Sequence, residues 1–289
     1  MILLAGCTVM PRAARGRGQA TTADQQAMAD ARANVQGLIR ESGAQAAVAF
    51  RSLDGGREVF INADEQFPAT SQWVEIPVTI ELYAEAQAKA LRLDDTLLVH
   101  NEFRSVDGDM YQLAPGLDPD PQLYRAIGQR VSLGDLDEQM MKQNSQLAAN
   151  LLIEHLGLNE INARLAELHA SGIKIEHAFQ DPAERKSGKR NTASARSMMQ
   201  ILWLLATNGA ISADASKEIV GVIANARTAT AGPFAANPES LAPGNVYQEA
   251  LIVYGARPFA LSVVVHGLKS GGASAALMAR ISHALAARD

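Results

Sequence analysis

Ser71 is the first residue of the chain whose type and position could do chemistry, because it stands where a helix is expected to begin. It follows Phe67 and Pro68 and precedes an apolar run. A serine hydroxyl is a weak nucleophile until an adjacent base takes its proton, and a lysine one helical turn later can supply that base. The position three residues on holds Val74, and no lysine precedes Lys89. Ser71 would therefore need an unconventional base.

Two carboxylates are the candidates for such a base. Glu75 follows Ser71 by about one helical turn, and Glu184 lies in an irregular, charged segment between residues 173 and 190. The histidines show no metal-ligand spacing, and the chain has no glycine-rich phosphate loop. We therefore expect no metal and no cofactor.

Periodicity and turn residues indicate the elements that must position these side chains. An alanine-rich helix over residues 23–41 precedes a β-hairpin, whose turn is Asp54-Gly55-Gly56. A helix interrupted by Pro77 follows, and the middle of the chain reads as helical. Two strands lie between residues 247 and 267, and an amphipathic helix over residues 273–287 ends the chain.

This order of elements predicts an α+β fold. Strands from both ends of the chain can share one antiparallel sheet, covered by the first and last helices. We expect one domain over residues 25–289. Its sheet unit would comprise residues 25–70 and 232–289, and its helical unit residues 71–231.

Composition limits the classes of function. The 289 residues are 47% hydrophobic and 20% charged, as in an ordinary folded globular protein. The net charge of -5 gives no electrostatic support for binding nucleic acid. No apolar run reaches the length of about 18 residues that a membrane-spanning helix needs.

The only cysteine, Cys7, has an informative setting. Leu4-Ala5-Gly6-Cys7 resembles the lipobox of bacterial lipoproteins, in which the cysteine is lipidated. The polar residues after it suit a tether, so we expect residues 1–24 to be a partial lipoprotein signal and tether. The protein would then be anchored by lipid in the bacterial cell envelope. The residues before Cys7 are too few for a complete signal peptide, so the protein would be cytosolic if Met1 is the true start.

Four segments resemble the class A β-lactamases and the wider penicillin-binding serine hydrolase superfamily. These segments are INADEQFPATS, LAANLLIEHLG, RNTASARSMMQIL and GARPFALSVVVHG. The likeness covers about residues 25 to 289. It implies an α/β sandwich with a five-stranded antiparallel sheet beside an all-helical subdomain. It also implies that three motifs, S-x-x-K, S-D-N and K-T-G, face a cleft between the two.

The first of these motifs is not intact. Alignment through FPATS places Ser71 and Val74 at the serine and lysine positions. Alignment through Ile-Pro-Val, which often follows the lysine in the family, places Gln72 and Glu75 there. Neither register gives a serine and lysine pair.

The other motifs also depart from the family pattern. By spacing, S-D-N falls on Asn144-Ser145-Gln146, where an amide replaces the proton-relaying serine. K-T-G falls on Glu239-Ser240-Leu241, or the segment is deleted, and a glutamate there would repel a substrate carboxylate. Asp181-Pro182-Ala183-Glu184 resembles the D-x-x-E of the omega loop, whose glutamate drives deacylation in the family.

Two functions remain open for a protein of this fold. It could be a catalytically degenerate envelope lipoprotein that binds a peptide, a cell-wall fragment or an envelope protein. It could also be a serine hydrolase of β-lactamase, esterase or peptidase type that uses Ser71 with Glu75 or Glu184. A third class is an interaction protein of unrelated fold. We expect contact with a membrane only through the lipid anchor, and none with nucleic acid.

Overall fold

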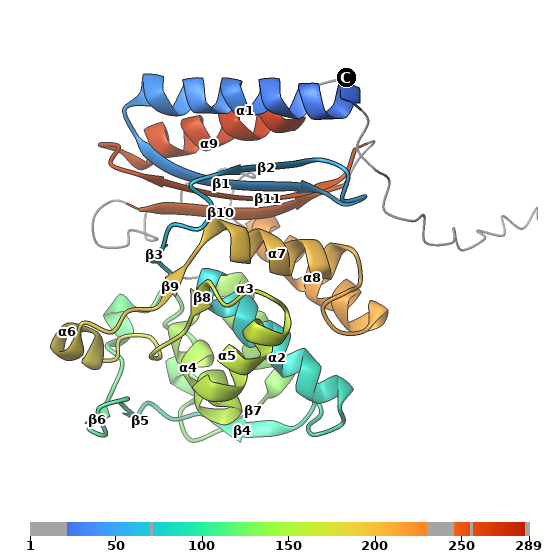
Figure 1. Cartoon of the computed structure of the whole chain (residues 1–289). Coiled ribbons are helices and arrows are strands. Elements are labelled where there is room, and N and C mark those ends of the chain that lie inside the picture. The colour runs from blue at the N-terminus through green and yellow to red at the C-terminus, as the bar shows by residue number, and fades with distance from the viewer. Residues whose placement is uncertain (1–21, 70–71, 230–245, 255–256, 287–289) are drawn as a thin grey trace, which may run out of the picture.

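The computed structural model describes residues 22–69, 72–229, 246–254 and 257–286. An antiparallel sheet carries α1 (Thr22–Ser42) and α9 (Gly271–Ala286) on one face, and a mostly helical part lies beyond its other face (Figure 1). The α+β class is therefore confirmed. Four of the five expected strands of this sheet lie within the described residues.

Strands from both ends of the chain form the main sheet. Each is antiparallel to its neighbour, in the order β10 (Tyr247–Val253), β11 (Phe259–His266), β1 (Gln45–Ser52) and β2 (Glu58–Ile61). In the central pair, Gln45 lies opposite His266 and Ser52 lies opposite Phe259. The predicted pairing of the N-terminal hairpin with the C-terminal strands is thus present.

The side chains of β11 alternate between two cores, as its sequence predicts. Phe259, Leu261, Val263 and Val265 are buried in a cluster with residues of α1 and α9. Ala260 and Val264 belong to the larger cluster on the opposite face. There α7 (Ala195–Ala206) packs against the sheet. Both faces of the sheet are therefore covered.

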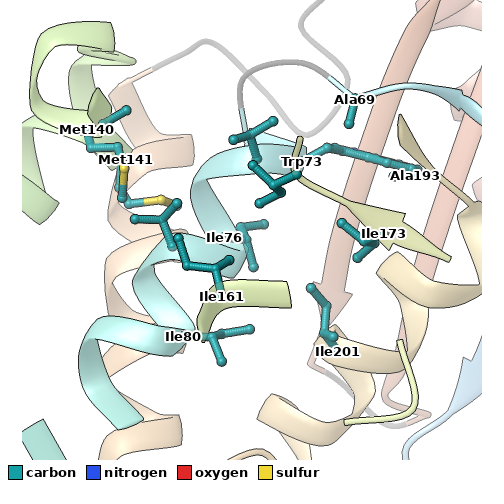
Figure 2. Close-up of a cluster of buried hydrophobic side chains, with 14 of the residues drawn as sticks. Ala69, Trp73, Ile76, Ile80, Met140, Met141, Ile161, Ile173, Ala193 and Ile201 are labelled. Carbon is teal, nitrogen blue, oxygen red and sulfur yellow. The ribbon is translucent and has the colours of Figure 1, made fainter. Parts of the chain in front are cut away.

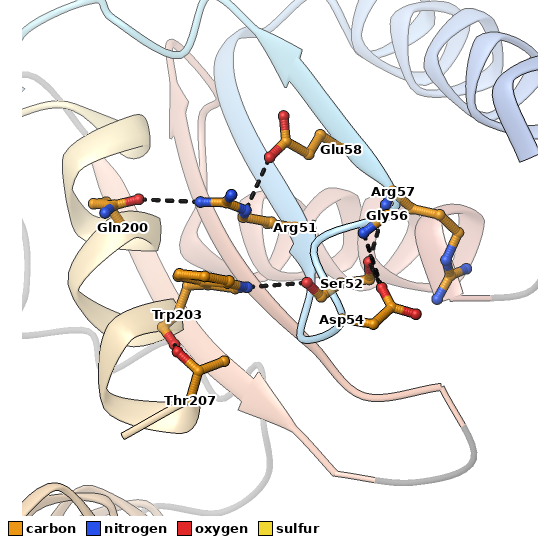
Figure 3. A network of polar contacts seen from close by, with 9 residues as sticks. All are labelled: Arg51, Ser52, Asp54, Gly56, Arg57, Glu58, Gln200, Trp203 and Thr207. Carbon is orange, nitrogen blue, oxygen red and sulfur yellow. Dashed lines mark hydrogen bonds and ion pairs between the residues drawn. The ribbon is translucent and has the colours of Figure 1, made fainter. Parts of the chain in front are cut away.

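Trp203 of α7 fixes the hairpin formed by β1 and β2 (Figure 3). The Arg51 guanidinium lies 3.9 Å from the centre of the Trp203 ring, and Trp203 Nε1 donates a hydrogen bond of 3.0 Å to the Ser52 carbonyl. Arg51 also pairs with Glu58 across the hairpin at 2.8 Å. The Asp54 carboxylate closes the turn by accepting hydrogen bonds from the Ser52 hydroxyl and the Gly56 N–H. These contacts hold the hairpin against the helices.

The helical part begins with α2 (Gln72–Gln87) and also contains α3 (Leu133–Gln143), α4 (Gln146–Leu156), α5 (Leu158–Glu167), α6 (Ala183–Ser187) and α8 (Ala213–Ala229). Short strands lie between these helices. One small sheet consists of β3 (Phe67–Pro68), β9 (Thr192–Ala193) and β8 (Ile173–Lys174). Two further pairs are β4 (Thr96–Leu98) with β7 (Arg130–Ser132), and β5 (Phe103–Arg104) with β6 (Met110–Tyr111). Two 3-10 helices span Pro115–Leu117 and Leu123–Ala126.

Helix α2 runs through the middle of the helical part and is buried on all sides from Trp73 to Ala84. Figure 2 shows its apolar side chains together with those of α3, α5 and α7, with Trp73, Ile76 and Ile80 labelled on α2. A helix that is apolar all round belongs inside a core. Any polar side chain on its first turns is therefore removed from water.

The apolar spacing over residues 147–168 is that of one continuous helix, but the structure has two helices there, α4 and α5. Gly157 separates α4 from α5 with a φ of 91°, a conformation that side-chain-bearing residues rarely adopt. Helix α5 then ends at Glu167. Periodicity did not reveal the break because Leu158, Ile161 and Leu165 continue the apolar pattern across it.

Candidate functional site

The residues before α2 are held between the two parts of the molecule. Phe67 and Pro68 pair with β9, and the Ala69 N–H donates to the Asn191 carbonyl at 2.8 Å. From the sheet edge, Gln248 Nε2 donates to the Pro68 carbonyl at 2.6 Å. The candidate nucleophile Ser71 lies outside the described residues. The described residues on either side of it are Ala69, which is held by these contacts, and Gln72, which begins α2.

Val74, one of the two candidates for the lysine position, is part of the apolar core. Its side chain is fully buried in the larger hydrophobic cluster. An isopropyl group neither accepts nor donates a proton. Val74 therefore cannot activate the Ser71 hydroxyl.

Glu75, the candidate in the other register, is also buried, with 1% of its surface exposed. Its Oε2 atom has no hydrogen-bond partner among the described residues. Burial raises the pKa of Glu75 well above its usual range, and the nearby carboxylates of Asp137 and Asp118 raise it further. Burial therefore favours the protonated, uncharged form of the side chain. An acid that keeps its proton cannot serve as a general base.

A second buried carboxylate lies close to Glu75. Asp137 of α3 is 1% exposed, and the Thr79 hydroxyl of α2 donates to its Oδ1 at 2.5 Å. Burial raises the pKa of Asp137 to about 7, although the Thr79 hydrogen bond opposes the shift. Asp137 is thus only partly ionised near neutral pH. Glu75 of α2 and Asp137 of α3 are thus two neighbouring buried acids whose uncharged form is favoured by burial.

The three residues at the S-D-N position serve the helix junction. Asn144 ends α3 in the left-handed conformation, with a φ of 52°. Ser145 is fully buried and caps α4, where its hydroxyl accepts from the Ala148 N–H. Gln146 Oε1 accepts a hydrogen bond of 2.8 Å from Gln180 Nε2. Each side chain or backbone group has a local structural task, and none of the three is a proton-relaying hydroxyl facing α2.

Asp118 completes this junction and was not singled out from the sequence. Its carboxylate accepts from the N–H groups of Gln146 and Leu147 at 3.0 and 2.9 Å, at the first turn of α4. The Tyr124 hydroxyl donates to it at 3.0 Å. A carboxylate at a helix N-terminus satisfies N–H groups that have no partner within the helix. It lies far from α4 in the sequence, so no local pattern revealed it.

A model of the β-lactamase enzyme family matches residues 30–288. The chain belongs to this family. The match covers both the sheet and the helical part, so the degenerate motifs lie within a complete β-lactamase-type domain. The resemblance to β-lactamases and penicillin-binding serine hydrolases seen in the sequence is confirmed.

Solved structures of the β-lactamase fold are similar over nearly the whole chain. A β-lactamase from Sphaerobacter thermophilus is 17% identical, with a TM-score of 0.64, and the match covers 90% of this chain and 95% of that chain. PBP-A is 17% identical, with a TM-score of 0.69 and coverage of 89% and 94%. The TLA-3 extended-spectrum β-lactamase is 13% identical, with a TM-score of 0.69 and coverage of 89% and 98%. No curated protein matches the sequence.

Glu184, the other candidate base, lies on the short helix α6. It is half-buried, and its N–H donates to the Asp181 carbonyl at 3.3 Å. In Figure 1, α6 stands at the outer edge of the helical part, away from the first turn of α2. The structure therefore does not bring Glu184 together with Glu75.

Asp181, in the same tetrapeptide, is a buried structural residue. Its carboxylate accepts from the Ser105 hydroxyl at 2.6 Å and from the Val106 and Ala183 N–H groups at 3.1 and 2.8 Å. These bonds tie the loop before α6 to the turn between β5 and β6. The first residue of the D-x-x-E pattern, Asp181, therefore has a structural role in holding this loop.

Asn150 holds the same loop from inside α4. Its side chain accepts from the Phe179 N–H at 2.7 Å and donates to the Phe179 carbonyl at 3.0 Å. It also donates to the Tyr111 hydroxyl at 3.2 Å. A fully buried asparagine within the apolar run AANLL was a signal that could have been found in the sequence.

The remaining predicted residues, Glu239, Ser240 and Cys7, lie outside the described part of the chain. It stays a prediction that Glu239 and Ser240 occupy the K-T-G position. It also stays a prediction that Cys7 is lipidated. No described helix is long and apolar enough to cross a membrane.

Proposed function

We propose that this β-lactamase-family protein has lost serine acyl transfer and binds a ligand in place of hydrolysing one. The observation that carries the proposal is the state of Glu75. A fully buried acid whose pKa is raised by burial stands where α2 would need a base, and the alternative position holds the equally buried Val74. Without a proton acceptor, the Ser71 hydroxyl remains a poor nucleophile.

The junction between α3 and α4 supports the proposal independently. Acyl transfer to a serine needs a donor that returns a proton to the leaving group. Asn144 offers an amide, and the buried Ser145 hydroxyl already caps α4. Because catalytic groups of such a set act as a unit, loss of several leaves little activity to be recovered by restoring one.

Intact-protein mass after long incubation with excess penicillin G tests this directly. Penicillin is a suitable probe because one similar solved structure, of a PBP-A variant, is an acyl-enzyme complex with penicillin G. We expect no mass increase in the wild type or in Ser71→Ala. An adduct on the wild type that is absent from Ser71→Ala would overturn the proposal and favour the serine-hydrolase alternative.

We further propose that the protein acts in the bacterial cell envelope, held there by a lipid on Cys7, and that its ligand is a peptide, a cell-wall fragment or an envelope protein. The lipobox-like Leu4-Ala5-Gly6-Cys7 supports the location. Expressed with its upstream sequence, the wild type should sediment with membranes, and Cys7→Ala should not. Equal soluble pools of both would contradict the anchor.

A cell-wall fragment provides the first test of binding. Muramyl dipeptide, titrated into the isotope-labelled protein, should shift amide resonances in the first turn of α2 and in β10. Gln248 of β10 contacts Pro68 of β3, the strand that precedes α2 in the chain. Absence of shifts at saturating fragment would remove the cell-wall fragment from the candidate ligands.

A further inference from the structure

A cavity of about 360 Å³ lies in the helical part, apart from the residues at the start of α2. Its walls come from the β5–β6 hairpin, the junction of α4 with α5, and the loop before α6. The floor is apolar, with the rings of Phe103 and Tyr111 and the side chains of Ile153 and Leu158. The two ring centres are 6.0 Å apart.

Acidic side chains are in excess around this floor. The charged residues of the lining are Glu154, Glu160, Asp181 and Arg104. The Asp181 carboxylate is fully engaged by its three hydrogen bonds. Glu154 has one partner, His100, whose Nε2 lies 3.0 Å away. Glu154 and Glu160 therefore remain available to a ligand.

Glu160 has an unusual placement. Its carboxylate folds back over Gly157, so closely that a Cβ atom on that residue would overlap with it. Among the described residues the carboxylate has no hydrogen-bond or ion-pair partner. The absence of a side chain at Gly157 thus lets an unpartnered carboxylate lie in the cavity wall.

We propose that this cavity binds a small organic cation that carries an ammonium group on an apolar body. The ammonium would lie between the carboxylates of Glu154 and Glu160, and the apolar body would cover the rings of Phe103 and Tyr111. Ligand sites combine an apolar lining with a few polar groups that fix orientation. Aromatic rings and carboxylates together select cationic groups over neutral or anionic ones.

Arg104 gives the proposal its sharpest test. It lines the same cavity, where its Nη1 donates to the Gly108 carbonyl of the hairpin turn at 3.0 Å. A cationic ligand is repelled by this guanidinium, whereas a zwitterion or an anion would be attracted to it. Removing the charge should therefore strengthen the binding of a cation and weaken the binding of the other two classes.

The experiment is an NMR titration of the isotope-labelled full chain with benzyltrimethylammonium. Dimethyl benzyl carbinol, an uncharged alcohol of nearly the same shape, serves as the ligand control. We expect saturable shifts of the Arg104 and Gly157 amides and of the Asn150 side chain with the cation. The alcohol should bind about tenfold more weakly or not at all. Equal binding of both compounds would overturn the charge argument.

Variants then locate the site. Glu160→Gln and Glu154→Gln should each weaken binding by about three- to fivefold, while Arg104→Ala should strengthen it. Glu102→Gln, an exposed carboxylate outside the lining, controls for net charge and should leave binding unchanged. Ala178→Leu, which enlarges a lining side chain, should abolish binding without loss of the folded spectrum. Unchanged affinity in Glu160→Gln, or weaker binding in Arg104→Ala, would contradict the proposal.

Discussion

Two groups of buried carboxylates in the helical part differ in how well they are satisfied. Asp118 and Asp181 each accept three or more hydrogen bonds, mostly from backbone N–H groups. Glu75 and Asp137 lie in the core beside α2, where Glu75 has an unpaired oxygen and Asp137 has a short bond to Thr79. The first group holds the architecture of the domain together. In the second group, burial raises the pKa of both carboxyl groups and so favours their uncharged forms.

The comparison separates carboxylates that stabilise the family fold from carboxylates that lie beside α2, where the family's chemistry would need a base. The helix junction at residues 144–146 and the loop before α6 keep their supporting hydrogen bonds. In the first turns of α2, by contrast, Glu75 has an oxygen without a hydrogen-bond partner among the described residues, and burial favours its uncharged form. The proposed loss of acyl transfer predicts such a difference, because the fold would be maintained while the catalytic groups are not.

The largest effect on stability should follow loss of the Asn150 side chain, which is fully buried. Asn150→Ala removes three hydrogen bonds. It leaves the Phe179 N–H without its partner, and the Phe179 carbonyl keeps only its bond from the Tyr111 hydroxyl. We expect the free energy of unfolding to fall by about 4 kcal/mol. Urea denaturation measures this, and Asn159→Ala, an exposed residue nearby, should change it by less than about 0.5 kcal/mol. A small effect of Asn150→Ala would mean that the loop is held from elsewhere.

Asp118→Ala should have the next largest effect. The variant leaves two N–H groups of α4 uncapped and the Tyr124 hydroxyl unpaired, so we expect a loss of about 3 kcal/mol. Asp118→Asn keeps one acceptor oxygen and should lose about half as much. Equal losses in the two variants would show that charge, rather than hydrogen bonding to α4, is what matters.

The pH dependence of stability should distinguish the two groups. The pKa of Asp137 is raised to about 7 in the folded state, so the folded chain holds a proton that the unfolded chain releases from about pH 4 upward. This stabilising contribution is complete at acid pH. It is lost as the pH rises towards about 7, at up to about 1.4 kcal/mol per pH unit.

Asp137→Asn provides the control for that slope, because an amide does not titrate. Urea denaturation at a series of pH values should show a shallower decline in the variant between about pH 4 and pH 7. A decline as steep as that of the wild type would assign the effect to other groups. Glu75, whose pKa is also raised, should add a decline of the same sign.

Much of the fold follows from local sequence, but the state of the site does not. The Asp54-Gly55-Gly56 turn and the alternation in β11 locate the hairpin and the central strand because both are set by adjacent residues. Ser194 was likewise recognisable as the cap of α7. By contrast, the burial of Glu75 depends on the packing of α3, α4, α5 and α8 around α2, and the cap from Asp118 comes from a distant loop. Contacts between segments that are far apart in the sequence produce no periodic pattern, so they could not be predicted from it.

The most direct measurement of the account is the protonation state of Glu75 at neutral pH. Infrared difference spectra between the wild type and Glu75→Gln isolate the carbonyl stretch of this one side chain. We predict the band of a protonated carboxylic acid at neutral pH, where an ordinary glutamate is ionised, because burial disfavours the charged form. Carboxylate bands alone at neutral pH would contradict the account. Glu75 would then be an ionised base one helical turn from Ser71, and the serine-hydrolase function would be favoured.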